Sequence, residues 1–240
     1  MDNSNSDVII RINNLRKVYN LGGKVDVEAL RGVSFDVKRG DFITIMGPSG
    51  CGKTTLLNLI GALDAPTEGY VEIDGQKTTD MSDLELTLLR RNKIGFIFQF
   101  YNLLPVLSAI ENVELPMLIS GVSKKKRRKK AEELLELVNL TERMQHKPEE
   151  LSGGERQRIA IARALSNDPL IILADEPTGD LDSETGRKIL AFLKQLNKEK
   201  KQTIILVTHD PETGSSGDKL ITMQDGQISG MKELSDYDWL

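Results

Sequence analysis

The chain contains four short, largely apolar runs, separated by longer stretches in which apolar residues follow a helical period. A short apolar run without polar alternation is typical of a strand that is buried on both faces of a sheet. Because strands that alternate with helices form a mainly parallel sheet, the pattern predicts an α/β core. The four runs are residues 42–46, 94–98, 170–174 and 203–207.

Two other regions depart from this pattern. Near the start, short β-rich runs are broken by glycines at positions 22, 23 and 32, which predicts a small antiparallel β subdomain. Between residues 108 and 164 apolar residues recur at helical spacing, so we expect a helical insertion into the α/β core. The β-rich runs are residues 8–15, 28–30 and 33–37.

Seven consecutive basic residues, 124–130, open one of the predicted helices. Such a run can contact anionic lipid or nucleic acid, or it can be an ordinary solvated helix face. Glu132, Glu133 and Glu136 follow within two turns, and i to i+4 pairing with them favours the solvated face.

Composition narrows the class of protein. The 240 residues carry a formal net charge of -4, which lacks the basic excess of nucleic-acid binders. The single cysteine and the polar start without a secretory pattern favour a reducing, cytoplasmic compartment. No run approaches the roughly 20 apolar residues that cross a bilayer, so a membrane role would depend on a partner.

A glycine-rich segment after the first apolar run fits the pattern G-x-x-x-x-G-K-[ST]. Its glycines let backbone N–H groups surround phosphate oxygens, Lys53 adds a cation, and the Thr54 hydroxyl suits Mg²⁺. Cys51 can simply fill a small position here, or the start of the helix can activate its thiol. The predicted nucleotide-binding residues are Gly47, Pro48, Ser49, Gly50, Cys51, Gly52, Lys53, Thr54 and Thr55.

The third apolar run ends in two carboxylates, Asp175 and Glu176. In a parallel sheet they would lie at the carboxyl edge, beside the phosphate loop. We expect Asp175 to hold Mg²⁺ through water and Glu176 to accept a proton from the attacking water. The alternative for an isolated acidic pair is a helix cap.

Residues Ser152, Gly153 and Gly154 precede a predicted helix and form a second potential anion site at a helix N-terminus. Taken alone, the segment is more often only an N-cap. One bound nucleotide does not need two such sites, so its purpose is open from the residues alone.

With these motifs in order, the chain resembles the ATP-binding-cassette (ABC) ATPases over about residues 8–230. LSGGERQ corresponds to that family's signature motif. The resemblance implies a P-loop NTPase of ABC-ATPase type, with a mainly parallel sheet core, an antiparallel β subdomain and an inserted helical subdomain. It also implies an ATP-dependent head-to-tail homodimer, in which Ser152, Gly153 and Gly154 of one subunit complete the other's ATP site.

The resemblance assigns four further positions. It places Tyr19 on adenine, Gln99 at Mg²⁺ as a sensor, His209 at the γ-phosphate and Asp182 opposite the other subunit's phosphate loop. Alone, Tyr19 is equally suited to β-sheet packing, and a strand-end histidine is more often structural. Catalytic roles are thus expected for Glu176, His209, Gln99 and Lys53, and metal contacts for Thr54, Gln99 and Asp175.

The resemblance also implies one cassette domain over residues 1–240. Residues 1–7 and 231–240 would be tails. Residues of about 8–98 and 168–230 would form the RecA-like core with the antiparallel β subdomain. Residues of about 99–167 would form the Q-loop, which begins at Gln99, and the helical subdomain. Two departures are noted: glycines and serines in 213–217 weaken an expected helix, and Asp180 stands where alanine is common in the family.

Architecture favours an ATPase that drives a membrane transporter. Soluble relatives that act on nucleic acid or the ribosome are the alternative. They insert very long coiled coils into the cassette or fuse two cassettes in one chain, and this sequence does neither. Several stretches, including residues 94–117, are similar to the lipoprotein-releasing and macrolide-exporting subfamily; an importer ATPase is an alternative. The resemblance implies Mg²⁺ and ATP as cofactors, an integral membrane permease as partner at the cytoplasmic face of the membrane, and a permease groove beside residues 100–118.

Overall fold

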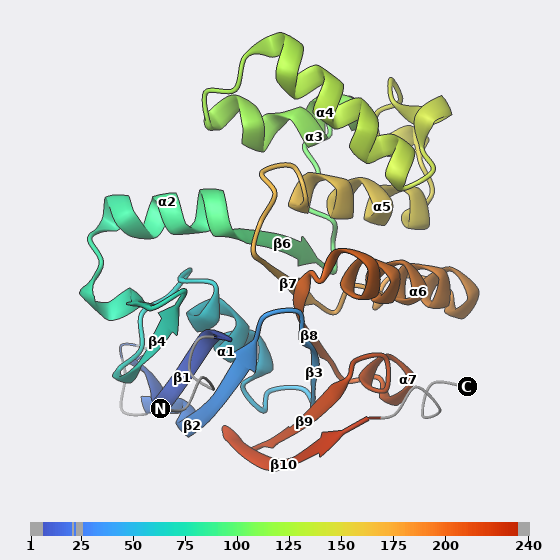
Figure 1. Ribbon diagram of the computed structural model, residues 1–240. Coiled ribbons are helices and arrows are strands. Elements are labelled where there is room, and N and C mark those ends of the chain that lie inside the picture. Colours follow the sequence, from blue (N-terminus) through green and yellow to red (C-terminus); the bar gives the residue numbers. More distant parts are fainter. Residues whose placement is uncertain (1–6, 21, 23–25, 235–240) are drawn as a thin grey trace. The chain divides into compact units, whose positions relative to one another are not determined.

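The computed structural model describes residues 7–20, 22 and 26–234 (Figure 1). The chain divides into two compact units, one of residues 1–87 and 194–240 and the other of residues 88–193. The chain passes between them within α2 (Asp83–Lys93) and α6 (Ser183–Lys200).

The first unit contains an antiparallel sheet in the order β2-β1-β4-β5. The expected break of the second strand at Gly32 is wrong, because β2 continues through it. Gly32, at φ +84°, is instead the extra residue of a bulge opposite Leu15 and Arg16, a position for which glycine is suited. The strands are β1 (Val8–Asn20), β2 (Asp26–Lys38), β4 (Glu68–Ile73) and β5 (Gln76–Lys77).

The same unit holds the parallel strands that carry the glycine-rich loop. β3 (Phe42–Met46) lies between β8 (Thr203–Thr208) and β9 (Lys219–Gln224), parallel to both, and β10 (Gln227–Glu233) runs antiparallel to β9. Every residue of β8 is buried, as its unbroken apolar pattern predicts. The remaining helices are α1 (Lys53–Ile60), the short 3-10 turn η2 (Thr78–Asp80) and α7 (Pro211–Gly214).

The second unit combines two parallel strands with helices. β6 (Ile94–Phe98) pairs with β7 (Ile171–Asp175), and α3 packs on α4 and α5 while α5 also packs on β6. A Cβ on Gly95 would lie 2.4 Å from the Ala164 carbonyl oxygen, so glycine allows α5 this close approach. The helices are α3 (Ala109–Ile119), α4 (Lys124–Leu137), η3 (Thr141–Arg143), η4 (Pro148–Glu150) and α5 (Gly153–Ala164).

The expected ends of the chain are only partly tested. The strand β10 extends to Glu233, so a tail from residue 231 begins too early; residues 1–6 and 235–240 lie outside the described part. The expected pairing in the basic run is present as Arg128–Glu132 and Lys129–Glu133. Among the described residues, none of the helices combines the length and apolarity needed to cross a bilayer.

Candidate functional site

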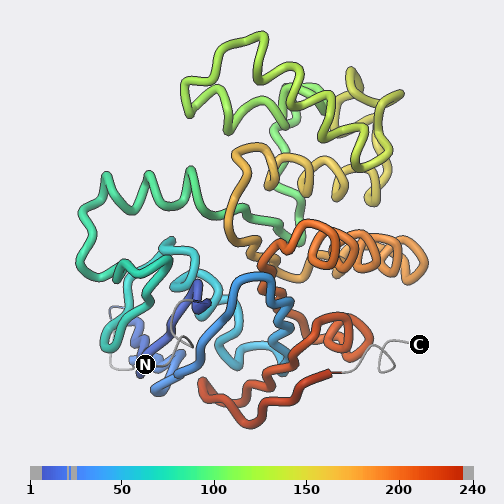
Figure 2. Tube along the Cα trace, in the orientation of Figure 1, coloured from blue at the N-terminus to red at the C-terminus, as the bar shows by residue number. Residues whose placement is uncertain are grey.

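The glycine-rich loop connects the end of β3 to the start of α1, and Figure 2 traces the Cα path of the chain. Gly50 and Gly52 have φ of +79° and +103°, a region that side-chain-bearing residues rarely adopt. A Cβ on Gly52 would lie 2.5 Å from the Ala29 carbonyl oxygen, and one on Gly47 would lie 2.3 Å from that of Met223. Glycine is therefore required at both ends of the loop by close backbone approach.

Cys51 is buried in this loop, with 4% of its surface exposed. Its sulfur lies 2.7 Å from the position that a Cβ of Gly47 would take. This favours the interpretation that the cysteine fills a small position.

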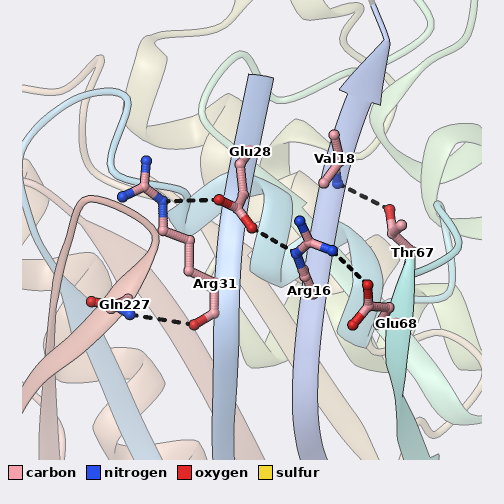
Figure 3. Close-up of polar contacts among 7 residues, drawn as sticks. All are labelled: Arg16, Val18, Glu28, Arg31, Thr67, Glu68 and Gln227. Atoms are coloured by element: carbon pink, nitrogen blue, oxygen red, sulfur yellow. Dashed lines mark hydrogen bonds and ion pairs between the residues drawn. The ribbon is translucent and has the colours of Figure 1, made fainter. Parts of the chain in front are cut away.

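The turn between β9 and β10 supports the loop from behind. The Gly226 N–H donates to the Cys51 carbonyl at 3.0 Å, and the Gly226 carbonyl accepts from the Arg31 N–H at 2.9 Å. Gln227 also donates to the Arg31 carbonyl at 3.5 Å (Figure 3). The turn thus joins the phosphate loop to β2 through two backbone hydrogen bonds and one from the Gln227 side chain.

A chain of charged side chains continues from that turn across the antiparallel sheet (Figure 3). Arg31 pairs with Glu28, Glu28 with Arg16, and Arg16 with Glu68 on β4. A third or more of each side chain is exposed, so solvent screens these pairs and their main effect is on strand alignment.

Lys53 is the first residue of α1 and is 7% exposed. Its ammonium group donates to the carbonyls of Gly47 at 2.7 Å and Pro48 at 3.0 Å, so it is held against the loop. In the described part of the chain, α1 has no side-chain cap and no acidic residue in its first turn. The N-terminal amides of α1 and the Lys53 ammonium group can therefore bind an anion together.

Tyr19 on β1 lies beside the first turn of α1. Its hydroxyl donates to Asp64 at 2.8 Å, and Thr55 also hydrogen-bonds to it. Burial, together with the Asp64 carboxylate, raises the pKa of Tyr19 above its ordinary value despite the opposing Thr55 bond. Lys17 bonds to the same carboxylate at 2.7 Å and lies 4.8 Å from the ring centre. The ring is thus held in place next to the phosphate loop.

His209 directly follows β8 and is exposed. Because Thr208 is paired with Met46, His209 and Gly47 leave the same edge of the parallel strands. The weak helix predicted after His209 is a single turn, α7, capped by Asp210, which accepts from the Thr213 N–H at 2.8 Å.

Packing explains the glycines in residues 213–217, the segment that weakens the expected helix. A Cβ on Gly214 would lie 2.9 Å from the sulfur of Met46, and one on Gly217 would lie 2.6 Å from the Phe42 carbonyl oxygen. Two glycines therefore let this segment lie directly on β3.

In the second unit, Gln99 and Glu176 each follow the last residue of a strand. Phe98 and Asp175 are paired, so the two side chains leave neighbouring strand ends. Glu176 has φ +46°, a conformation that residues with a Cβ rarely adopt. A Cβ on Gly179 would lie 3.0 Å from the Gln99 amide nitrogen, so the turn after Glu176 lies close against Gln99.

The start of α5 carries a complete capping box. The Ser152 hydroxyl accepts from the Glu155 N–H at 3.3 Å, while the Glu155 carboxylate accepts from the Ser152 N–H at 2.8 Å. Burial opposes ionisation of Glu155, but these bonds and Arg143, at 3.2 Å, hold its pKa below the ordinary value.

The two glycines of this segment lie against the turn that follows Glu176. A Cβ on Gly154 would lie 2.5 Å from a methyl carbon of Thr185, and one on Gly153 would lie 3.2 Å from Leu181. Asp182 caps α6, accepting from the Thr185 N–H at 3.0 Å, and the hydrogen bonds with Thr185 lower its pKa. The second unit thus gathers Gln99, Asp175, Glu176, Ser152–Gly154 and Asp182.

Sequence reasoning missed several supporting residues. The dipeptide Asp225-Gly226 is a recognisable turn signal, but its contact with the loop depends on the fold. Asp64 and Lys17, which hold Tyr19, and Tyr101, described below, have no sequence signal of their own.

Comparison with known proteins places this geometry in a family. Residues 30–179 match the family described as ABC transporter. The chain is 50% identical to the uncharacterized ABC transporter ATP-binding protein MJ0796 of Methanocaldococcus jannaschii over 96% of this chain and 99% of that one. A solved structure of MJ0796, described as a dimeric post-hydrolysis state bound to ADP and Pi, has a TM-score of 0.87 at 48% identity, covering 95% of this chain and 99% of that chain.

Two further relatives have named roles. The lipoprotein-releasing system ATP-binding protein LolD 1 of Chlorobium chlorochromatii is 44% identical over 95% of this chain and 93% of its own length. The macrolide export ATP-binding/permease protein MacB of Syntrophobacter fumaroxidans is 47% identical over 92% of this chain, which spans 31% of that longer protein. The chain therefore belongs to the ABC transporter family, as one of its ATP-hydrolysing ATP-binding proteins.

Proposed function

We propose that two copies of this chain power a membrane transporter of the lipoprotein-release or macrolide-export type. Each nucleotide is held between the phosphate loop of one copy and Ser152–Gly154 of the other. The likeness to LolD and MacB supports the transporter type, and the dimeric state described for MJ0796 supports the pairing. The catalytic assignment depends on one observation. Glu176 follows the end of β7, and Gln99 follows the paired end of the neighbouring strand β6.

Nucleotide binding falls mainly to the first unit. Residues 47–55 surround the phosphates with backbone N–H groups, the Lys53 ammonium and the first turn of α1. Tyr19, held by Asp64 and Lys17, offers a ring face to adenine.

Magnesium accompanies the nucleotide. The described residues hold no cluster of three His, Cys, Asp or Glu that could bind a metal alone. Mg²⁺ commonly relies on phosphate oxygens and water together with one or two protein ligands. The hydroxyl of Thr54, the amide oxygen of Gln99 and the carboxylate of Asp175 are hard oxygen donors that suit this role.

Hydrolysis falls mainly to the second unit. Glu176 accepts the proton of the attacking water, a general-base role worth roughly 10² to 10⁴ in rate. His209 of the first unit donates a hydrogen bond to the γ-phosphate. Gln99 is the sensor that withdraws when this phosphate leaves. Asp182 faces the partner copy, so hydrolysis depends on pairing.

The permease contact lies just after Gln99. Phe100, Leu104 and Val106 are 70%, 43% and 76% exposed, a concentration of apolar surface in one short segment. Exposed apolar clusters mark protein interaction sites. A helix of a permease would cover this segment at the cytoplasmic face of the membrane.

The variant Glu176→Gln tests the catalytic assignment. ATP binding stays, turnover falls by roughly 10² to 10⁴, and sedimentation with Mg-ATP gives a dimer. Glu133→Gln, an exposed glutamate on α4, is the control and retains wild-type turnover. Undiminished turnover in Glu176→Gln would refute the role of Glu176, and a monomer at saturating Mg-ATP would refute the pairing.

A second experiment tests the transporter. Affinity purification of the chain from solubilised native membranes recovers a permease, and Phe100→Asp with Val106→Asp loses it while ATP binding persists. Leu84→Asp, at an apolar position that is 68% exposed in the wild type, is the matched control and keeps the permease. Recovery of ribosomes or nucleic acid in its place would contradict the transporter assignment.

A further inference from the structure

Tyr101 occupies an unusual position two residues after Gln99. Its backbone has φ +59°, followed by Asn102 at φ +51°, and only 6% of the tyrosine is exposed. Arg163 on α5 holds this turn, donating to the Tyr101 carbonyl at 2.8 Å and also to that of Asn102. Two successive left-handed residues persist only where their surroundings fix them, and the two bonds from Arg163 do so.

The Tyr101 side chain reaches the turn that follows Glu176. Its hydroxyl donates to the Asp180 carboxylate at 3.2 Å, and the Arg156 guanidinium lies 5.0 Å from the ring centre. Burial, and then the Asp180 charge, raise the pKa of Tyr101 above its ordinary value. Asp180 is the position at which this sequence departs from the family's common alanine.

The same hydroxyl lies close to the start of α5. It lies 3.0 Å from the position that a Cβ of Gly153 would take, and Leu181 lies 3.2 Å from that position. Tyr101 therefore joins three segments of the second unit: the residues after Gln99, the Ser152–Gly154 segment, and the Asp180–Asp182 turn.

We propose that Tyr101 is a positioning residue that fixes the Ser152–Gly154 segment and the Asp180–Asp182 turn as one preformed face for the partner copy. The inference rests on the proposed function, in which both segments meet the second copy. A face that is already ordered loses less entropy on association than one that must be ordered then. Removing the Tyr101–Asp180 hydrogen bond weakens dimer formation and leaves nucleotide binding by the single copy intact.

The test measures the dimerisation constant of the full chain in the Glu176→Gln background with Mg-ATP, by sedimentation. Adding Tyr101→Phe or Asp180→Ala weakens dimerisation about threefold to tenfold, the range of one hydrogen bond. The double variant is no weaker than either single variant, because both remove the same bond. Asp180→Asn, which keeps an acceptor, stays within about twofold of the parent.

Controls separate positioning from general damage. Tyr70→Phe, on a ring that contacts Lys77 in the first unit, leaves dimerisation unchanged. The affinity of the single copy for ATP stays at the parental value in Tyr101→Phe, and the melting temperature falls by no more than the few degrees that one hydrogen bond accounts for. Parental dimerisation in both Tyr101→Phe and Asp180→Ala, or losses that add in the double variant, would overturn the inference alone. Failure of the Glu176→Gln parent to dimerise would overturn the proposed pairing and this inference with it.

Discussion

The starts of α1 and α5 are both sites at which a helix can bind an anion, but they are built in opposite ways. α1 begins after Gly52, with Lys53 as its first residue and, among the described residues, no capping side chain. α5 begins after Ser152, whose hydroxyl and backbone exchange hydrogen bonds with Glu155. One helix offers its N-terminal amides with a cation, and the other satisfies part of them with its own carboxylate.

This difference indicates that the two helix starts contribute differently to phosphate binding. The start of α1 can hold phosphate strongly by itself, because cation and helix dipole act together. At the start of α5 the Glu155 carboxylate opposes a second anion, so Ser152–Gly154 suits a phosphate that is already bound elsewhere. The proposed order is therefore that ATP binds to the phosphate loop first and that the α5 segment of a partner copy contacts it afterwards.

The largest effect expected on ATP affinity comes from Gly52→Ala. The new Cβ would lie 2.5 Å from the Ala29 carbonyl oxygen, at φ +103°. Distortion of the loop lowers ATP affinity about a hundredfold, equivalent to about 3 kcal/mol of backbone strain. Calorimetric titration with Mg-ATP measures it.

Gly50→Ala is the matched control for this change. Gly50 also has positive φ, at +79°, but nothing lies within 4 Å of its Cβ position. Its loss of affinity is smaller because only the conformational strain remains. Equal losses in the two variants would show that backbone contact with Ala29 does not matter.

The next effect sharpens the comparison at α5. Ser152→Ala leaves ATP binding by the single copy unchanged but lowers steady-state turnover about tenfold or more, since a donor to the shared phosphate is lost. It also removes a helix cap worth about 1 kcal/mol.

Ser108→Ala separates these two consequences. Ser108 caps α3 in a capping box of the same kind, with Glu111, and is not among the residues assigned to the nucleotide. It loses the same cap energy and keeps full turnover in a standard phosphate-release assay. A similar fall in turnover for both variants would mean that Ser152 acts only as a cap.

A smaller effect is expected at Tyr19. Tyr19→Ala lowers ATP affinity about tenfold, because stacking on a base is worth roughly 1 to 3 kcal/mol. Tyr19→Phe removes the hydroxyl bond to Asp64 but keeps the ring, and its affinity stays near the wild-type value. Competition between ATP and inorganic triphosphate shows which part of the ligand loses affinity. Tyr19→Ala binds inorganic triphosphate, which has no base, as well as the wild type does.

The smallest effect concerns pH and the α5 cap. The folded-state pKa of Glu155 is depressed, so its charge contributes stability above its unfolded pKa of about 4.3 and loses that contribution as pH falls through the folded value. Wild type is therefore more stable than Glu155→Gln at neutral pH, and the difference disappears in acid. Urea unfolding of both proteins over a pH series measures it, and a constant difference would contradict the assigned cause.

Much of the fold could be predicted because strong local patterns coincide with the elements. The apolar runs at β3, β6, β7 and β8 were predicted to within a residue, and the glycine-rich loop falls between β3 and α1 as expected. The predicted break at Gly32 failed because a glycine that interrupts a strand and one that forms a bulge within it have the same sequence pattern.

Contacts between distant segments could not be predicted. Gly226 supports Cys51 across 175 positions, and Tyr101 reaches Asp180 across 79, and neither separation has a periodic signal. The departures at Asp180 and in residues 213–217 become intelligible only when their neighbours Tyr101, Met46 and Phe42 are in place. The roles of Glu176, His209 and Asp182 stay predictions.

The central claim is that each ATP site is shared between copies, and mixing two inactive variants tests it most directly. Lys53→Ala damages the phosphate loop, and Ser152→Arg damages the α5 segment. A mixed pair has one site with both defects and one site with none. Mixing equal amounts therefore restores about a quarter of wild-type ATP turnover, because half of randomly formed pairs are mixed and each has one intact site. Turnover of the mixture that equals the average of the two separate variants would contradict the account.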